Sequence, residues 1–129
     1  MELYEKKTNG KVLALAHNVN VSNGLMFPEV NPVTGKPLTN GYAKTRARWE
    51  PIYEVTQIKG DGEAHPFLSP NDEFADYETW DDANLDGTQV KTKDMLQYEY
   101  ARSALKLGLQ LEKKLGVNPF KFGMAGGTD

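Results

Sequence analysis

Cysteine is absent from this 129-residue sequence, which excludes disulfide bonds and thiolate-bound zinc. Long apolar runs are absent too: the longest, VLALA at residues 12–16, is far too short to cross a bilayer. The first residues, MELYEKK, mix acidic and basic side chains and do not resemble a secretion signal. We therefore expect a soluble chain without a membrane span. The sequence carries no signal for a particular compartment.

Clusters of basic residues are also missing. The net charge is −3, the lysines and arginines are scattered, and the acidic residues crowd into residues 71–86 (NDEFADYETWDDANLD). Nucleic-acid-binding surfaces concentrate positive charge on one face, so nucleic acid is not an expected partner. The acidic run lacks the alternating carboxylates, central glycine and final glutamate of a calcium loop, and we interpret it as a solvated face.

Helices and strands alternate along the chain. Apolar, β-branched runs predict strands at residues 12–16, 52–58 and 120–125. Helices are predicted at residues 3–7, 40–50 and 92–115, the second capped by Thr39 or Asn40. The longest helix carries an apolar stripe at spacings of three and four, formed by Leu96, Tyr100, Ala104, Leu107, Leu111 and Leu115.

This order predicts an α/β fold, because strands separated by helices pair in parallel. We expect about three parallel strands, one long helix and two long loops, at residues 17–41 and 59–91. A parallel sheet needs cover on both faces, and one long helix does not supply it. Residues 1–129 are therefore predicted to form a single incomplete domain, truncated at both ends.

Polar side chains gather where the predicted strands end. His17 and Asn18 follow the first strand, Glu54 lies within the second, and Asp129 follows the third. Loops at the carboxyl ends of parallel strands converge, so these residues are expected at one edge of the sheet. Imidazole and carboxylate are ligands for zinc, manganese or iron when thiolate is lacking.

Each of these residues also has a simpler interpretation. A histidine that follows an apolar strand, as His17 does, is more often a hydrogen-bonded structural residue. The position of His65 before Pro66 is explained equally by an exposed turn. Glu54 would be a solvated strand residue, although a parallel sheet covered on both faces has no wet side for it. These alternatives stay open at the level of residue patterns.

Three runs carry a family resemblance: LALAHNVNVSNGLMFP, EVTQIKGDGEAHPFLSPNDEFADYE and LQYEYARSALK. Together they closely resemble a large bacterial family of unknown function (DUF3604), related to the PHP (polymerase and histidinol phosphatase) hydrolases. The resemblance covers almost the whole chain. It implies a distorted (β/α) barrel of PHP type, of which this chain would be a part, with divalent ions in a ring of His, Asp and Glu used for phosphoester hydrolysis.

The resemblance assigns ligands motif by motif. AHN gives His17, IYEV gives Glu54 with His65 of EAHP as its rival, and AGGTD gives Asp129. The HxH pair of such enzymes occurs nowhere in the sequence, and the histidine that follows the last aspartate is not reached. We therefore expect a fragment of a metal-dependent hydrolase that is silent by itself because it supplies too few ligands.

An anionic small-molecule substrate, such as a phosphoester, is the expected partner of the complete enzyme. Its candidate binding residues are Asn18, Asn20, Asn23 and Lys59, although loop-stabilising hydrogen bonds are the more common role of such asparagines. The alternative is a small non-enzymatic domain that binds a partner through the acidic and aromatic loop at residues 67–86. The sequence predicts no particular oligomeric state.

Overall fold

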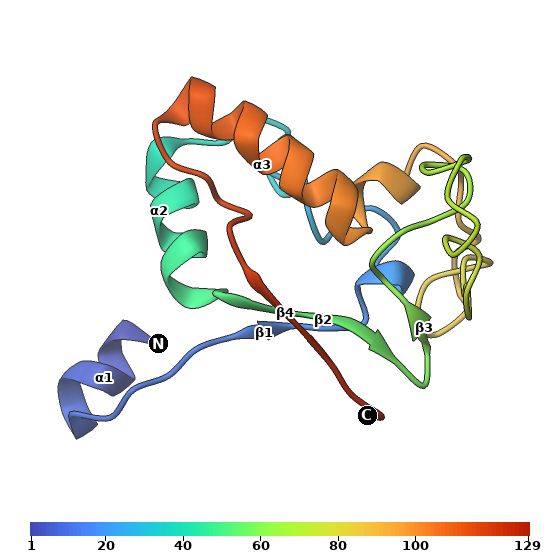
Figure 1. The fold of residues 1–129 in the computed structure, drawn as a ribbon. Helices are drawn as coiled ribbons and strands as arrows, with labels where there is room; N and C mark the ends of the chain where they lie inside the picture. The colour runs from blue at the N-terminus through green and yellow to red at the C-terminus, as the bar shows by residue number, and fades with distance from the viewer.

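A small parallel sheet lies under one long helix. The computed structural model describes all of residues 1–129. In chain order its elements are α1 (Glu2–Thr8), β1 (Leu15–Ala16), the 3-10 turn η1 (Val19–Val21), α2 (Asn40–Trp49), β2 (Ile52–Gln57), β3 (Gly60–Asp61), the 3-10 turn η2 (Leu96–Tyr98), α3 (Ala101–Leu115) and β4 (Gly123–Gly126) (Figure 1). The predicted α/β class is therefore confirmed.

β2 is the centre of the sheet. β1 and β4 both pair with it in parallel, with Leu15 opposite Ile52 and Gly123 opposite the same residue. β3 pairs antiparallel with the end of β2 and forms a hairpin that lies within the predicted loop 59–91. Gly60 makes this hairpin at φ 99°, a backbone conformation that glycine adopts without strain. The predicted parallel pairing is confirmed, and the sheet is open rather than closed into a barrel.

The predicted boundaries agree with the structure for α2 but not for the two outer strands. α2 begins at the predicted cap, where the Thr39 hydroxyl accepts a hydrogen bond from the Tyr42 amide at 3.2 Å, and it ends just before Pro51. The two outer strands are shorter than predicted, because β1 keeps only the last two residues of the VLALA run and β4 starts at Gly123. Residues 120–122, predicted as strand, supply two aromatic rings to the core instead.

The prediction of one continuous helix over residues 92–115 is wrong. Tyr100 is extended, with φ −96° and ψ 141°, and α3 begins only at Ala101. The amides of Ala101 and Arg102 donate to the carbonyls of Gly62 and Glu63 at 2.7 and 3.1 Å. The start of α3 is thus set by the segment after β3, a tertiary contact that overrides the local helical pattern.

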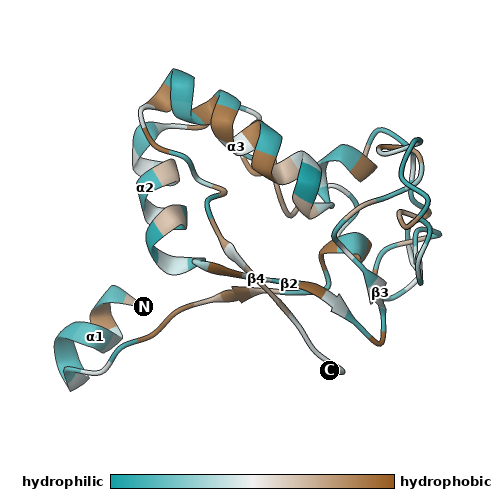
Figure 2. Cartoon of the chain, in the orientation of Figure 1, coloured by the Kyte–Doolittle hydropathy of each residue, from teal (hydrophilic) through white to brown (hydrophobic).

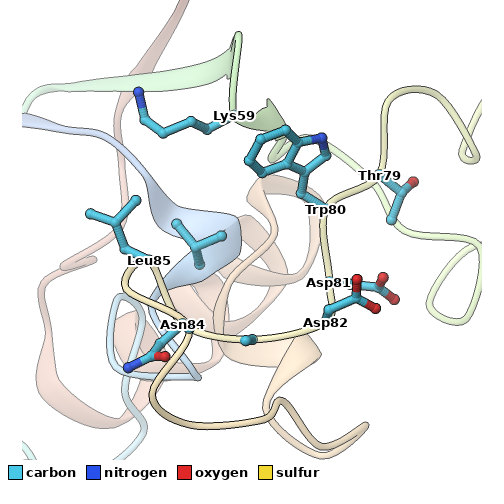
Figure 3. A pocket seen from close by; sticks show the side chains of 10 residues that line it. Lys59, Thr79, Trp80, Asp81, Asp82, Asn84 and Leu85 are labelled. Carbon is cyan, nitrogen blue, oxygen red and sulfur yellow. The ribbon is translucent and has the colours of Figure 1, made fainter.

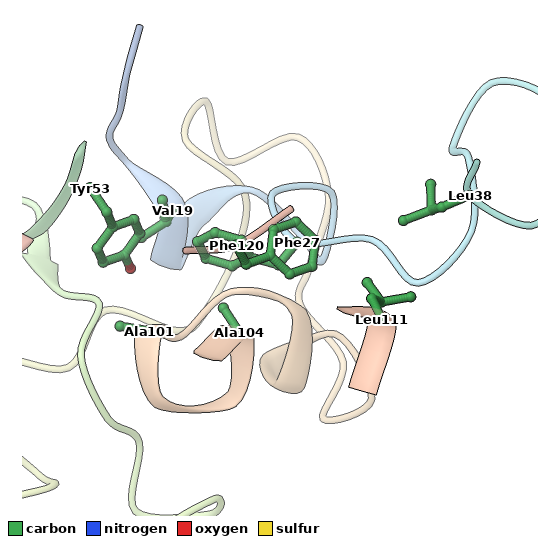
Figure 4. Packing of buried hydrophobic residues seen from close by; sticks show 8 residues of the cluster. All are labelled: Val19, Phe27, Leu38, Tyr53, Ala101, Ala104, Leu111 and Phe120. Atoms are coloured by element: carbon green, nitrogen blue, oxygen red, sulfur yellow. The ribbon is translucent and has the colours of Figure 1, made fainter. Parts of the chain in front are cut away.

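The core lies between α3 and the sheet. Its eight buried residues are Val19, Phe27, Leu38, Tyr53, Ala101, Ala104, Leu111 and Phe120 (Figure 4). Figure 2 shows apolar and polar bands alternating along α3, as expected for a helix that buries one side. The rings of Phe27, Tyr53, Phe120 and Phe122 contact one another with centroids 4.9 to 5.6 Å apart. These aromatic contacts join three parts of the chain that are distant in sequence.

The second face of the sheet is open. All four residues of β4 are exposed, and Glu54 in β2 is half-buried. The rule that a sheet covered on both faces has no wet side therefore does not apply to Glu54. Side chains alternate along a strand, so Tyr53 faces the core while Glu54 faces away from it.

A buried ion pair joins the loops beside the core. The Lys91 ammonium lies 2.7 Å from both carboxylate oxygens of Glu99, and their side chains are 2% and 0% exposed. The same ammonium donates to Asn23 at 3.2 Å, and the Ser22 hydroxyl donates to Glu99 at 3.3 Å. Burial raises the pKa of Glu99, while Lys91 acts in the opposite direction. The pair thus fixes the long loop after β1 against the segment before α3.

We predict that replacing Lys91 with Met lowers the free energy of unfolding by about 3 to 5 kcal/mol, because it leaves the Glu99 carboxylate buried without a partner. The double variant Lys91→Met with Glu99→Leu should recover most of this loss. Urea denaturation measures both effects, with the exposed Lys106→Met as the control. A single variant as stable as the control would contradict the prediction.

Replacing Leu111, which is 4% exposed, with Ala should cost about 2 to 5 kcal/mol, because it opens a cavity between α3 and the aromatic cluster. Leu109, 64% exposed on the same helix, is the matched control and should cost about 0.5 kcal/mol or less when changed to Ala. Thermal or urea unfolding of both variants makes the comparison. Equal losses would show that α3 is not packed by the face described here.

Candidate functional site

Polar side chains meet at the carboxyl end of the parallel strands. The Gln57 amide nitrogen donates to Asn18 Oδ1 at 2.7 Å and lies 3.4 Å from Glu54 Oε2. The Asn20 amide donates to the Lys59 carbonyl at 2.8 Å. Since β1 and β2 run in the same direction, the residues that follow them are delivered to the same edge, as the sequence predicts.

Lys59 and Asp129 complete this group. The Lys59 ammonium forms an ion pair with Asp129 Oδ2, which connects the end of β2 with the residues after β4. The Lys59 backbone amide also donates to Gln57 Oε1 at 2.8 Å. We call the six residues Asn18, Asn20, Glu54, Gln57, Lys59 and Asp129 the carboxyl-end cluster. Gln57 is the one member outside the candidate metal-binding and substrate-binding residues, although its place two positions before Lys59, at the end of the second predicted strand, indicates the same edge.

His17 stands at the same end of the sheet. It follows β1 directly, and its side chain is exposed. No hydrogen bond or ion pair joins it to Asp129 in the structure. The close approach of His17 to Asp129 therefore stays a prediction, supported by the common direction of β1 and β4.

His65 lies apart from this cluster. Its Nδ1 accepts a hydrogen bond from the Phe67 amide at 3.0 Å, so its proton is on Nε2, which faces Asp81 Oδ2 at 2.9 Å. The His65 ring also packs against the Tyr100 ring in a T-shaped arrangement, with centroids 5.2 Å apart. Both ring nitrogens are thus engaged in holding the loop after β3.

Asn23 also serves the loops rather than the cluster. Its amide donates to the Gln89 carbonyl at 3.0 Å, and its oxygen accepts from Lys91. The loop-stabilising interpretation of this asparagine fits these contacts. Asn20 has both roles. Its amide donates to the Lys59 and Trp80 carbonyls, so it belongs to the cluster and also holds two loops together.

The predicted ligands do not form a metal centre in this arrangement. No group of three or more His, Asp or Glu side chains is positioned to hold a metal ion. Glu54 is within reach of the Gln57 amide, and Asp129 is paired with Lys59. The donor types of His17, Glu54 and Asp129 suit zinc, manganese or iron, but their geometry does not fit a preassembled site for these ions.

A cavity of about 520 Å³ borders the cluster at Lys59. Its other lining residues come from η1 and from the acidic loop: Val21, Thr79, Trp80, Asp81, Asp82, Ala83, Asn84, Leu85 and Gly87 (Figure 3). Figure 3 shows Lys59 and Trp80 on one side of this space and Asn84 across from them. Trp80 is 53% exposed in this wall. Its place in the same cavity wall as Lys59 is set by tertiary structure, because the two residues lie on different segments of the chain.

Asp61 is a second feature that the sequence did not indicate. It lies in β3, is 8% exposed, and its Oδ1 has no hydrogen-bond partner. Burial raises the pKa of this carboxyl from 3.8 to about 7, and the charges of Glu63 and Asp76 add to the shift. The Ala64 amide and the charge of Arg102 act in the opposite direction. An aspartate next to a glycine in a predicted loop is typical of an ordinary turn, so the local sequence does not indicate that Asp61 is buried.

These features define an open α/β domain with a polar cluster at the carboxyl end of its parallel strands. The chain belongs to the DUF3604 family, described as a protein of unknown function, whose family model matches residues 1–129. Neither a curated protein nor a solved structure matches the chain. None of its helices has both the length and the apolar sequence needed to span a membrane.

The raised pKa of Asp61 predicts a pH-dependent stability. The folded state favours the protonated carboxyl, so this contribution is complete below about pH 4 and is lost as the pH rises through about 7. Replacing Asp61 with Asn removes the dependence, so the variant should gain stability relative to the parent between about pH 5 and pH 8. Urea denaturation at both pH values tests this, with Asp94→Asn as the control. A constant difference between variant and parent would contradict it.

Proposed function

We propose that the carboxyl-end cluster is the substrate-binding part of a hydrolase site that takes a small anionic molecule such as a phosphoester. The observation that carries this proposal is the position of Lys59, whose ammonium belongs to the cluster and whose side chain borders the cavity of about 520 Å³. An ammonium next to a cavity favours an anionic ligand, because it supplies charge and up to three hydrogen-bond donors.

The Lys59–Asp129 pair indicates how such a ligand would be held. The Asp129 carboxylate stands where an oxygen of a phosphate or carboxylate group would accept a hydrogen bond from Lys59. Asn18 uses its oxygen to accept from Gln57, which leaves its amide hydrogens available to a second ligand oxygen. Trp80 would cover an apolar part of the same molecule from the cavity wall.

The reaction class rests on the family resemblance. We propose a relation to the PHP metal-dependent hydrolases, supported by the arrival of the strands that precede His17 and Asp129 at the edge where Glu54 lies. In such an enzyme divalent zinc, manganese or iron would supply the activated water. His65 is a weaker candidate ligand than Glu54, because Phe67 and Asp81 occupy both of its ring nitrogens.

Anion binding is tested by replacing Lys59 with Gln and titrating inorganic phosphate and phenyl phosphate into the protein. Calorimetry should show binding that the variant weakens about tenfold, because a charged hydrogen bond is lost. Lys44→Gln, which removes the same charge from exposed α2, is the matched control and should change affinity less than about twofold. If the two variants weakened phosphate binding equally, the anion would be attracted by the net charge of the protein and not by a specific site at Lys59.

Metal binding by this chain should be weak and limited to a single ion, because Glu54 and Asp129 are engaged by other side chains. Calorimetric titration with zinc and manganese measures it, together with assays of a phosphomonoester and a phosphodiester. We expect no metal-dependent turnover by the chain alone. Tight binding of two or more ions with turnover would show that the ligands assemble in a way that this structure does not contain.

A second candidate function is non-catalytic binding of a partner by the loop at residues 67–86. It is favoured by the exposure of four aromatic side chains in that loop, Phe67, Phe74, Tyr77 and Trp80. The two proposals differ in their dependence on Lys59. Binding of phosphate that is lost in Lys59→Gln favours the first, and a chain that binds neither phosphate nor phenyl phosphate favours the second.

A further inference from the structure

Asparagine is followed directly by glycine at three places in the chain, at residues 9–10, 23–24 and 40–41, and each asparagine is preceded by serine or threonine. Asparagine is a chemically labile residue, and a following glycine leaves its backbone nitrogen unhindered because it has no side chain. That nitrogen can attack the asparagine side chain and displace ammonia. The local sequence is so similar at the three places that a difference in their reactivity in the folded protein must come from the structure.

Two of the three asparagines are held by other parts of the chain. Asn23 is 8% exposed, its amide donates to the Gln89 carbonyl at 3.0 Å, and its oxygen accepts from the Lys91 ammonium at 3.2 Å. Asn40 is exposed, but it is the first residue of α2 and its amide donates to the Leu115 carbonyl at 2.7 Å. To react, either side chain must leave its partners and turn toward the following nitrogen, which requires local opening of the structure.

Asn9 has no such partner. It follows the last residue of α1 in the left-handed conformation, with φ 56° and ψ 15°, and its exposed side chain makes no hydrogen bond. The Gly10 amide donates only to the hydroxyl of Thr8, at 3.1 Å and at the surface. α1 buries none of its residues, and its ion pairs to the rest of the protein are those with Arg48, so opening this end of the helix costs little free energy.

We propose that Asn9 is a site of spontaneous deamidation and isomerisation in the folded protein. The Gly10 nitrogen forms a bond to Cγ of Asn9, the bond between Cγ and Nδ2 breaks, and Nδ2 leaves as ammonia with the proton that the Gly10 nitrogen gives up. A water molecule then opens the resulting cyclic succinimide. Opening at Cγ gives aspartate, and opening at the main-chain carbonyl gives isoaspartate, in which the backbone continues through the former side chain.

The isoaspartyl product changes the end of α1. It adds a carbon atom to the backbone at the residue whose left-handed conformation caps the helix, where the Asn9 amide donates to the Glu5 carbonyl at 3.0 Å. It also places a carboxylate at the negative end of the helix dipole. Modification therefore releases α1 and leaves the core intact. This inference does not depend on the proposed hydrolase function.

The test incubates the full chain for several days at neutral pH and follows the three asparagines by peptide mass spectrometry. Methylation by an isoaspartyl methyltransferase identifies the isoaspartyl product. We expect Asn9 to react about tenfold faster than Asn40 and Asn23, or more, because about 1.4 kcal/mol of additional opening free energy is enough for that ratio. In concentrated urea, where no structure protects them, the three should react at similar rates.

The variant Gly10→Ala tests the chemistry without touching the core. A methyl group at this position would lie 3.0 Å from the Thr8 hydroxyl and from the ring of Tyr4, both of which belong to exposed α1. The variant should slow the reaction at Asn9 about tenfold, because the methyl group hinders the attacking nitrogen. Gly41→Ala makes the same change in α2 and is the matched control, which should leave the rate at Asn9 unchanged.

The proposal is overturned if the folded chain modifies Asn40 or Asn23 as fast as Asn9, or if Asn9 stays intact in the folded chain while it reacts in urea. Equal rates at Asn9 in the Gly10→Ala and Gly41→Ala variants would also overturn it. The release of α1 is tested on the purified isoaspartyl form, which should lose the helical NMR shifts of α1 and keep those of β2. Unchanged α1 shifts in that form would contradict the release.

Discussion

The buried pair of Lys91 and Glu99 is the constraint on which the loops of this structure depend. Neither charge is solvated, so each is acceptable in the interior only while the other is present. Asn23 and Ser22 complete the hydrogen bonding around the pair, which ties the loop after β1 to the segment before α3. Little regular secondary structure holds these segments, so polar contacts determine where they lie.

The geometry of the carboxyl-end cluster depends both on the sheet and on the position of these loops. The parallel sheet brings Asn18, Lys59 and Asp129 to one edge. Their side chains meet only if the loops that carry them pack against that edge. Asn20 connects these loops to the cluster, because it lies in η1 and its amide donates to the carbonyls of Lys59 and Trp80. The sheet therefore sets which residues can meet, and the loops set the distances between them.

Sequence patterns predicted what local chemistry and strand direction determine. The α/β class, the parallel pairing, the Thr39 cap and the gathering of Asn18, Lys59 and Asp129 at one edge follow from such patterns. The start of α3 could not be predicted, because it depends on two carbonyls at positions 62 and 63 that lie far away in sequence. Asp61 and the Lys91–Glu99 pair were missed for the same reason, since burial of a charged residue has no local sequence signal.

Helix α1 shows how unevenly stability is distributed in this chain. It buries none of its seven residues, and it stands apart from the body in Figure 1. Arg48 of α2 holds it through Glu5 at 3.0 Å and Glu2 at 3.7 Å. A helix of this length is not stable by itself in water, and exposed ion pairs are screened by salt. Backbone amides of α1 should therefore exchange with solvent through local opening that leaves the core intact, faster as ionic strength rises, while amides of β2 exchange only when the whole domain unfolds.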